Sequence, residues 1–130
     1  MAAPLRFLLI DDDPLNNFLN EIIIGLAEGE SEIITFTDPR EGLDYIESHY
    51  TPNDIRHTIM LLDINMPQMT AWDFLEKFES FPSSIQRQFD NYILSSSVNI
   101  QSKKIAALYP VIKGYIEKPL NKKLLDELFA

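Results

Sequence analysis

The sequence predicts an α/β fold in which a doubly wound, five-stranded parallel sheet carries five helices in a three-layer sandwich. Short apolar runs of strand length alternate with longer segments whose apolar residues recur at helical spacing, and this alternation is typical of a parallel sheet covered by helices. The 130 residues have the size of one domain, and with 45% hydrophobic residues the chain can bury a substantial core. We therefore expect one domain over residues 1–130.

The predicted elements follow one another as five strand–helix pairs. Two helix starts are well marked, because Asp13 precedes Pro14 and Asp38 precedes Pro39, which places a capping carboxylate before a proline in the first turn. The predicted strands are 5–10, 33–36, 58–62, 91–95 and 111–116, and the predicted helices are 14–27, 39–48, one starting near 70, 100–108 and 120–129. The third strand is apolar on both faces, which predicts a central position in the sheet.

Apolar spacing also indicates the amphipathic pattern of the first three helices. The residues at helical spacing are Leu15, Phe18, Leu19, Ile22, Ile23 and Leu26 in the first helix, Leu43 and Ile46 in the second, and Trp72, Leu75 and Phe78 in the third. We expect those of the second and third helices to be buried.

Composition narrows the range of functions. Eleven Lys plus Arg against twenty Asp plus Glu give a net charge of -9, so nucleic acids and anionic membranes would be repelled. The absence of cysteine excludes disulfides, thiolate metal sites and cysteine nucleophiles. The longest apolar runs are too short for a signal peptide or a membrane span. We expect a soluble cytoplasmic protein that binds neither nucleic acid nor membrane directly.

Three carboxylates fall at predicted strand ends, where ligands of such sheets bind. Asp11 and Asp12 follow the first strand, and Asp63 follows the third. A lone Asp-Asp pair is usually a turn or capping feature, but Asp63 at a second strand end favours a shared site. Carboxylates gathered in this way need a hard cation, for which magnesium is better suited than zinc. Asn65 could add its backbone carbonyl.

Two further residues lie at the ends of the fourth and fifth strands. The hydroxyl of Ser95 can point into the same crevice, although a serine there is also a common turn residue and Ser96 and Ser97 follow it. Lys118, just before Pro119, supplies the cation that a phosphoryl group beside three carboxylates requires, unless it is an ordinary surface lysine. The proline favours a fixed turn, which a cis bond could provide.

Four segments in this order resemble the receiver domains of bacterial response regulators: FLLIDDDP, MLLDINMP, YILSSS and GYIEKPL. Each segment is unspecific alone, but all four at successive strand ends are highly specific, and the resemblance covers nearly the whole chain. It implies a flavodoxin-like sheet with strand order 2-1-3-4-5. It also implies two-component signalling, with a phosphoryl group received from a sensor histidine kinase or a histidine phosphotransfer protein.

The resemblance implies a role for each residue of the motifs. Asp63 is the implied phosphoacceptor, and Asp12, Asp63 and the carbonyl of Asn65 are the implied Mg²⁺ ligands, with Asp11 acting through water. Ser95 corresponds to the hydroxyl that binds the phosphoryl group, and Lys118 to the lysine that pairs with it. Tyr115 corresponds to the aromatic rotamer switch, although a half-buried strand tyrosine would fit the spacing equally well. Pro119 would follow a cis peptide bond.

The chain departs from the family pattern after MPQM, where Thr70 and Ala71 replace the usual Asp-Gly and the freedom of glycine at positive φ is lost. Two connections, 50–57 and 81–89, also look longer than usual, and we have no functional interpretation of them.

We interpret the chain as a signalling domain that assists its own phosphorylation and dephosphorylation rather than as an enzyme. One alternative is a receiver-like module that docks a partner without phosphorylation. The other is a hydrolase with an aspartyl-phosphate intermediate, but such enzymes commonly carry an acid two positions after the nucleophile, where this chain has Asn65. The sequence identifies neither the kinase nor the downstream target.

Overall fold

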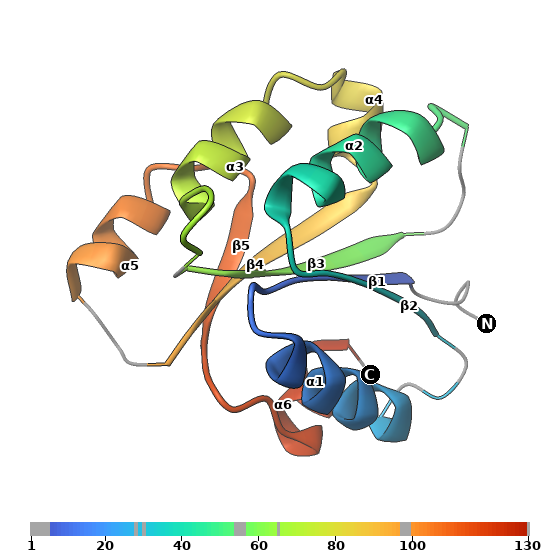
Figure 1. The fold of residues 1–130 in the computed structure, drawn as a ribbon, viewed down its shortest axis with the longest axis vertical. Coiled ribbons are helices and arrows are strands. Elements are labelled where there is room, and N and C mark those ends of the chain that lie inside the picture. The colour runs from blue at the N-terminus through green and yellow to red at the C-terminus, as the bar shows by residue number, and fades with distance from the viewer. Residues whose placement is uncertain are drawn as a thin grey trace.

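The fold is described by a computed structural model covering residues 6–27, 29, 31–53, 57–64, 66–96 and 100–129. Strands and helices alternate along the chain (Figure 1). The strands are β1 (Arg6–Ile10), β2 (Glu32–Phe36), β3 (Thr58–Asp63), β4 (Phe89–Ser95) and β5 (Ile112–Glu117). The helices are α1 (Pro14–Ala27), α2 (Pro39–His49), α3 (Ala71–Phe78), α4 (Ser83–Gln86), α5 (Ile100–Ala106) and α6 (Lys122–Phe129).

The five strands form one parallel sheet in the order β2-β1-β3-β4-β5, which confirms the expected topology. The central strands β1 and β3 are buried along their whole length, as the apolar character of β3 predicted. Ile10 is paired with Leu62, and Asp63 with Leu94. This register brings the residues after β1, β3 and β4 to the same edge of the sheet.

Helices cover both faces of the sheet and complete the three layers (Figure 1). On one face α1 and α6 lie side by side, over a core that includes Phe7, Leu61 and Leu125. On the other face α2, α3 and α4 cover a larger core, in which Phe74 and Phe78 are fully buried. Helix α5 lies near β5 at the edge of the sheet (Figure 1).

The predicted helix starts agree with the hydrogen bonds. Asp13 Oδ1 accepts a bond of 2.9 Å from the N–H of Leu15, and Asp38 Oδ1 accepts one of 2.9 Å from the N–H of Arg40. Thr70 caps α3, since its hydroxyl oxygen accepts a bond of 3.1 Å from the N–H of Asp73. Thr70, which stands where the resembling domains usually have aspartate, is therefore the N-cap of α3.

Apolar spacing located α1 but did not identify its buried face. Within this helix Asn17 and Ile24 are buried, whereas five of the six apolar residues of the pattern are exposed. These exposed residues are Leu15, Phe18, Leu19, Ile22 and Leu26. In α2 and α3 the expectation holds for Leu43, Ile46, Leu75 and Phe78, while Trp72 is only partly buried and stacks on Tyr109.

The described residues contain one helix more than the five expected. The additional helix, α4, is a single turn within the connection between α3 and β4, and it buries Ile85 against the larger core. Its four residues are too few for an amphipathic pattern, so sequence periodicity could not reveal it. None of the helices in the described parts of the chain is both long and apolar enough to cross a membrane.

Candidate functional site

Three carboxylates meet at the edge of the sheet where β1 and β3 end. Asp11 and Asp12 follow β1, and Asp63 is the last residue of β3. Each can place one carboxylate oxygen so that all three oxygens lie within 4.8 Å of one another. Asp11 and Asp63 are buried, with 2% and 4% exposure, and Asp12 is partly exposed. The structure thus brings together the three carboxylates that the sequence placed at strand ends.

Lys118 lies between two of these carboxylates. Its Nζ donates a hydrogen bond of 2.9 Å to Asp63 Oδ1 and another of 3.0 Å to Asp11 Oδ2. The backbone N–H of Lys118 donates a bond of 2.7 Å to the carbonyl of Ser95, which ties the residue to the end of β4. The peptide bond between Lys118 and Pro119 is cis, as expected. Lys118 is therefore a site residue and not a solvated surface lysine.

The surroundings of Asp63 and Lys118 shift the pKa of both groups upward. Burial is the main cause for Asp63, and the charges of Asp11 and Asp12 add to it, while the bond from Lys118 acts in the opposite direction. Burial alone would lower the pKa of Lys118, but its bonds to Asp63 and Asp11 outweigh that effect and raise it. Both shifts favour the protonated form, which is the charged form of the lysine and the neutral form of the carboxyl.

Asn17 positions Asp11, and sequence reasoning did not single it out. The Nδ2 group of Asn17 donates bonds of 3.0 Å to the carbonyl of Asp11 and 3.1 Å to that of Phe36, joining the ends of β1 and β2. Asp11 itself accepts a bond of 2.9 Å from the N–H of Asp13. Helix α1 contains three asparagines, Asn16, Asn17 and Asn20, and no sequence pattern distinguishes Asn17 from the other two.

Of the other predicted site residues, the structure describes Ser95 and Tyr115 but not Asn65. Ser95 is buried at the end of β4, one residue after Leu94, which pairs with Asp63. Tyr115 lies in β5 and is partly buried, and its hydroxyl oxygen is buried without a hydrogen-bond partner among the described residues. The Nζ of Lys103 lies 5.7 Å from the centroid of its ring, which links α5 to β5. Asn65 lies outside the described residues.

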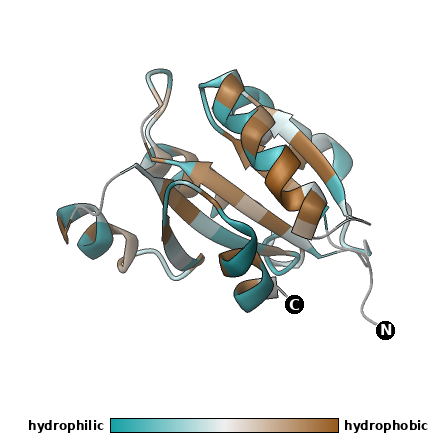
Figure 2. Cartoon of the chain, turned by 90° about the horizontal axis from the view of Figure 1, so that it is seen from below, coloured by the Kyte–Doolittle hydropathy of each residue, from teal (hydrophilic) through white to brown (hydrophobic). Residues whose placement is uncertain are grey.

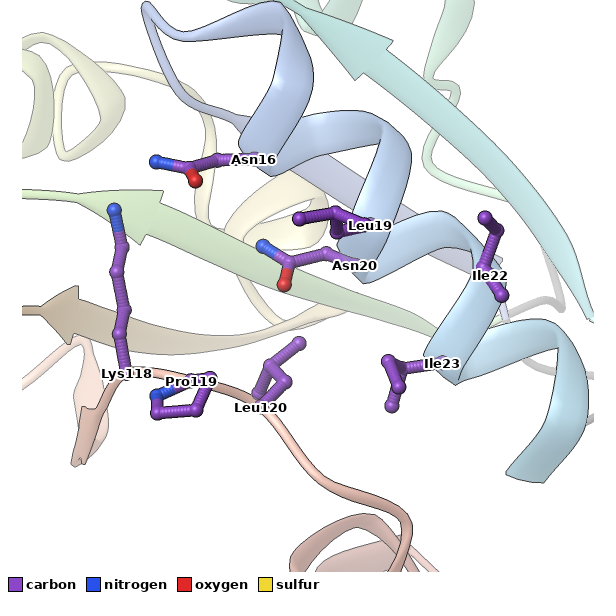
Figure 3. A pocket seen from close by; sticks show the side chains of 8 residues that line it. All are labelled: Asn16, Leu19, Asn20, Ile22, Ile23, Lys118, Pro119 and Leu120. Atoms are coloured by element: carbon purple, nitrogen blue, oxygen red, sulfur yellow. The ribbon is translucent and has the colours of Figure 1, made fainter.

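A groove of about 280 Å³ adjoins the site between α1 and the segment after β5. Figure 3 shows Lys118 at one end of it, with Asn16 and Asn20 facing it from α1 and Pro119 and Leu120 opposite. The carboxylates themselves do not line this groove. Among the described residues, Lys118 is the one that this mostly apolar groove shares with the site.

The donor set fits a hard divalent cation. Carboxylate oxygens are the ligands that Mg²⁺ prefers in proteins, and the three side chains that meet here, Asp11, Asp12 and Asp63, all offer carboxylate oxygens. Both oxygens of Asp11 already accept hydrogen bonds, one from Asp13 and one from Lys118. Asp12 and Asp63 are therefore the carboxylates better placed to contact a cation directly.

The family described as the response regulator receiver domain matches residues 7–130. The chain therefore belongs to this family and is a receiver domain of two-component signalling.

Solved structures of similar proteins agree with this assignment. A response regulator receiver protein from Dyadobacter fermentans is 27% identical, with a TM-score of 0.87 over 95% of this chain and 94% of that one. A two-component response regulator from Cytophaga hutchinsonii is also 27% identical, with a TM-score of 0.86 over 98% and 96% of the two chains. The chemotaxis protein CheY4 of Vibrio cholerae, 22% identical over 97% of each chain, shares the fold with a TM-score of 0.75.

A curated relative is longer than this chain. The transcriptional regulatory protein FlgR of Helicobacter pylori is 21% identical over 123 residues, which are 95% of this chain and 28% of that protein. The chain thus spans less than a third of the length of this relative.

Proposed function

We propose that Asp63 accepts a phosphoryl group from a phosphohistidine of a sensor histidine kinase or a histidine phosphotransfer protein, in a magnesium-dependent reaction in the cytoplasm. The observation that carries this proposal is the contact of Lys118 with Asp63, beside Asp11 and Asp12 at the edge of the sheet. A carboxylate can act as a nucleophile toward phosphorus, and the adjacent cation can neutralise charge on the transferred group.

The transfer exchanges one bond to phosphorus for another. A carboxylate oxygen of Asp63 attacks the phosphorus while the P–N bond to the imidazole breaks, and the electron pair of that bond remains on the imidazole nitrogen. Lys118 is already 2.9 Å from Asp63 Oδ1, so its ammonium is in place to contact a phosphoryl oxygen without a large rearrangement. The domain thereby assists its own modification without being an enzyme acting on other molecules.

Asp12 and Asp63 would hold Mg²⁺ directly, and Asp11 would act through water. Bound Mg²⁺ would supply positive charge to the phosphoryl oxygens during transfer. The bonds that Asp11 accepts from Asp13 and Lys118 support the indirect role, because they occupy both of its carboxylate oxygens. Asp11 then fixes Lys118 and orients water, which is the part that an outer carboxylate plays at a metal site.

Phosphorylation would change the conformation of the β5 and α5 region. An acyl phosphate on Asp63 adds negative charge that Lys118 and the hydroxyl of Ser95 can contact at the ends of β5 and β4. Tyr115 lies on β5 three residues before Lys118, and its buried hydroxyl has no hydrogen-bond partner among the described residues. A change in the position of Ser95 or α5 could give this hydroxyl a partner, which would bias the equilibrium between two conformations.

Incubation with Mg²⁺ and a small acyl phosphate, followed by intact mass measurement, tests the proposal. We expect one phosphoryl group on the wild-type protein, none on Asp63→Asn, and none when a chelator removes the metal. Asp44→Asn, which changes an exposed aspartate of α2, is the matched control and should be modified as the wild type is. A wild-type chain that neither a small donor nor a phosphohistidine protein can modify would instead support docking without phosphorylation.

A further inference from the structure

A cavity of about 290 Å³ lies at the end of the sheet opposite the three carboxylates. Its walls come from α4, from the start of β4 and from the segment that leads into β5. Hydrophobic colouring runs along the middle of the sheet (Figure 2), whereas Asp90, Asn91 and Lys113 place polar groups at this end of β4 and β5. Ligand pockets span roughly 300–1,000 Å³, so this cavity has room for a small ligand.

The wall formed by α4 is anchored to the rest of the fold. The Nε2 group of Gln88 donates a hydrogen bond of 2.7 Å to the carbonyl of Thr51 and one of 3.0 Å to that of Ser84. Ile85 of α4 is buried in the larger core. The two connections that look longer than usual, 50–57 and 81–89, are thus tied together, and the second of them supplies one preformed side of the cavity.

The charged residues that line the cavity are two cations, Arg87 and Lys113. In a chain with a net charge of -9, such a cavity attracts anions to a place that the rest of the surface does not offer them. The Nζ of Lys113 lies 2.9 Å from Asp90 Oδ1, so its charge is already paired. Arg87 has no ion-pair partner among the described residues. One uncompensated positive charge matches a monocarboxylate better than a phosphate dianion.

Asn91 adds a buried hydrogen-bond acceptor to the same cavity. It is 2% exposed, and its Oδ1 has no hydrogen-bond partner among the described residues. Its Nδ2 group donates a bond of 3.2 Å to the carbonyl of Val111, which determines the side of the amide on which the oxygen lies. A buried acceptor without a donor is unfavourable, so a ligand that brings an N–H or O–H group would satisfy it.

Strand β5 is irregular beside Asn91. Asn91 pairs with Ile112 and Tyr92 with Gly114, so Lys113 is an extra residue of β5 at this point. Bulges of this kind redirect side chains and are frequent beside functional sites. The extra residue here is one of the two cations that line the cavity.

We propose that this cavity binds a small monocarboxylate that also carries a neutral hydrogen-bond donor and an apolar group. The carboxylate pairs with Arg87, and the donor bonds to Oδ1 of Asn91. The apolar group packs against Phe89, Pro110 and Val111. A charged ammonium is disfavoured as the donor, because two cations already line the cavity. An N-acylated amino acid has these groups, and so does the carboxyl end of a peptide.

The inference goes beyond phosphoryl transfer and does not depend on it. The cavity lies at the amino-terminal ends of β4 and β5, whereas Asp63 lies at the carboxyl end of β3. Asp63→Asn should therefore bind the ligand as the wild type does, and Arg87→Gln should accept a phosphoryl group as the wild type does. A failure of either proposal is thus distinguishable from a failure of the other.

Titration of the whole chain with N-acetyl-leucine, followed through backbone amide chemical shifts, tests the cavity. We expect a dissociation constant on the order of 1 mM, with the largest shifts at residues 83–91 and 111–113. N-acetyl-leucinamide lacks the carboxylate, and 4-methylpentanoate lacks the N–H donor. Each should therefore bind at least about tenfold more weakly.

An N-acetylated tripeptide that ends in leucine separates the two sources of this chemistry. An affinity equal to or above that of N-acetyl-leucine would identify the carboxyl end of a peptide as the ligand. A weaker affinity would identify a free acid of the size of one amino acid.

Two substitutions test the polar groups separately. Arg87→Gln removes the unpaired cation, so the dissociation constant for N-acetyl-leucine should rise at least about tenfold. Lys104→Gln removes another exposed cation, from α5, and should leave the constant unchanged. In Asn91→Val, N-acetyl-leucine should bind no better than 4-methylpentanoate, because the acceptor is gone. That variant also loses the bond to Val111, so the same two ligands on the wild type test Oδ1 of Asn91 even where the variant does not fold.

Three results would overturn the proposal. The first is a wild-type chain whose shifts at residues 83–91 and 111–113 do not respond to N-acetyl-leucine. The second is binding that N-acetyl-leucinamide reproduces or that Arg87→Gln leaves unchanged, because the carboxylate and the guanidinium then play no part. The third is inorganic phosphate that binds in the cavity at least as tightly as N-acetyl-leucine, which would make the site one for phosphate.

Discussion

The Nζ of Lys118 lies 2.9 Å from Oδ1 of Asp63, a residue 55 positions earlier in the chain. The same nitrogen lies 3.0 Å from Oδ2 of Asp11, so one ammonium is shared by two buried carboxylates. Each of the three residues lies at the carboxyl end of a different strand. The sheet thus assembles a single charged cluster from distant parts of the sequence.

Lys118→Met should destabilise the protein by roughly 3 kcal/mol at neutral pH, because it leaves two buried carboxylates without their cation. In an Asp63→Asn background the same substitution should cost less, since only Asp11 then remains unpaired. Lys122→Met is the control, because Lys122 forms an exposed ion pair with Asp126 that should contribute only a few tenths of a kcal/mol. Urea unfolding of the wild type, the two single variants and the double variant measures the free energies of unfolding. If the losses of the single variants add up to that of the double variant, Lys118 and Asp63 are not coupled.

Asp63→Asn should stabilise the metal-free protein at neutral pH. The pKa of Asp63 is raised in the folded state, so its contribution to stability is present below its ordinary pKa of 3.8 and is lost as pH rises through the folded value. Solvent at the rim of the site screens these charges, so we expect a gain of only on the order of 1 kcal/mol. Unfolding curves should be recorded in the presence of a chelator between about pH 4 and pH 7. The difference in the free energy of unfolding between the variant and the wild type should increase with pH. A constant gap would contradict the electrostatic account.

Asp12→Ala should weaken Mg²⁺ binding by more than about tenfold, because it removes a carboxylate that we propose to contact the cation. Asp11→Ala should have a smaller effect, since the proposed role of Asp11 is to act through water and through Lys118. Asp13→Ala is the neighbouring control. It removes the cap of α1 and costs about 1 kcal/mol of stability, but it should leave the affinity for Mg²⁺ unchanged. Isothermal titration calorimetry gives the affinities, and equal binding by wild type and Asp12→Ala would exclude Asp12 from the site.

Ser95→Ala should separate phosphorylation from the conformational change. In the proposed function the hydroxyl would contact the phosphoryl group only after transfer, so the variant should keep substantial phosphorylation, with no more than about a tenfold loss of rate. Chemical shifts recorded before and after addition of beryllofluoride, a phosphoryl mimic, should move at Tyr115 and α5 in the wild type but not in Ser95→Ala. Lys118→Ala should disturb both steps. Shifts confined to the pocket in the wild type would rule out the switch.

The location of the site followed from the sequence because its residues come directly after recognisable strands. Asp63 follows a wholly apolar run, and in a parallel sheet every such position lies at one edge. The strand order and the cis bond before Pro119 were expected through the family resemblance and are confirmed. The sharing of Lys118 between Asp11 and Asp63 depends on side-chain positions that no local pattern encodes.

Other features depended on tertiary packing and could not be predicted from periodicity. The apolar spacing of α1 did not identify its buried face, since this helix buries Asn17, whose side chain bonds the ends of two strands, and leaves most of its large apolar residues exposed. Helix α4 was not predicted, since a single turn carries too few residues for a pattern.

Chemical trapping of the acyl phosphate tests the account most directly. Borohydride reduces an aspartyl phosphate to homoserine, so the modified residue can be located by peptide mass mapping after treatment with Mg²⁺ and a small acyl phosphate. We predict homoserine at position 63 in the wild type and at none of the other aspartates, including Asp11 and Asp12. Homoserine at Asp11 or Asp12, with Asp63 unchanged, would contradict the assignment of Asp63 as the phosphoacceptor.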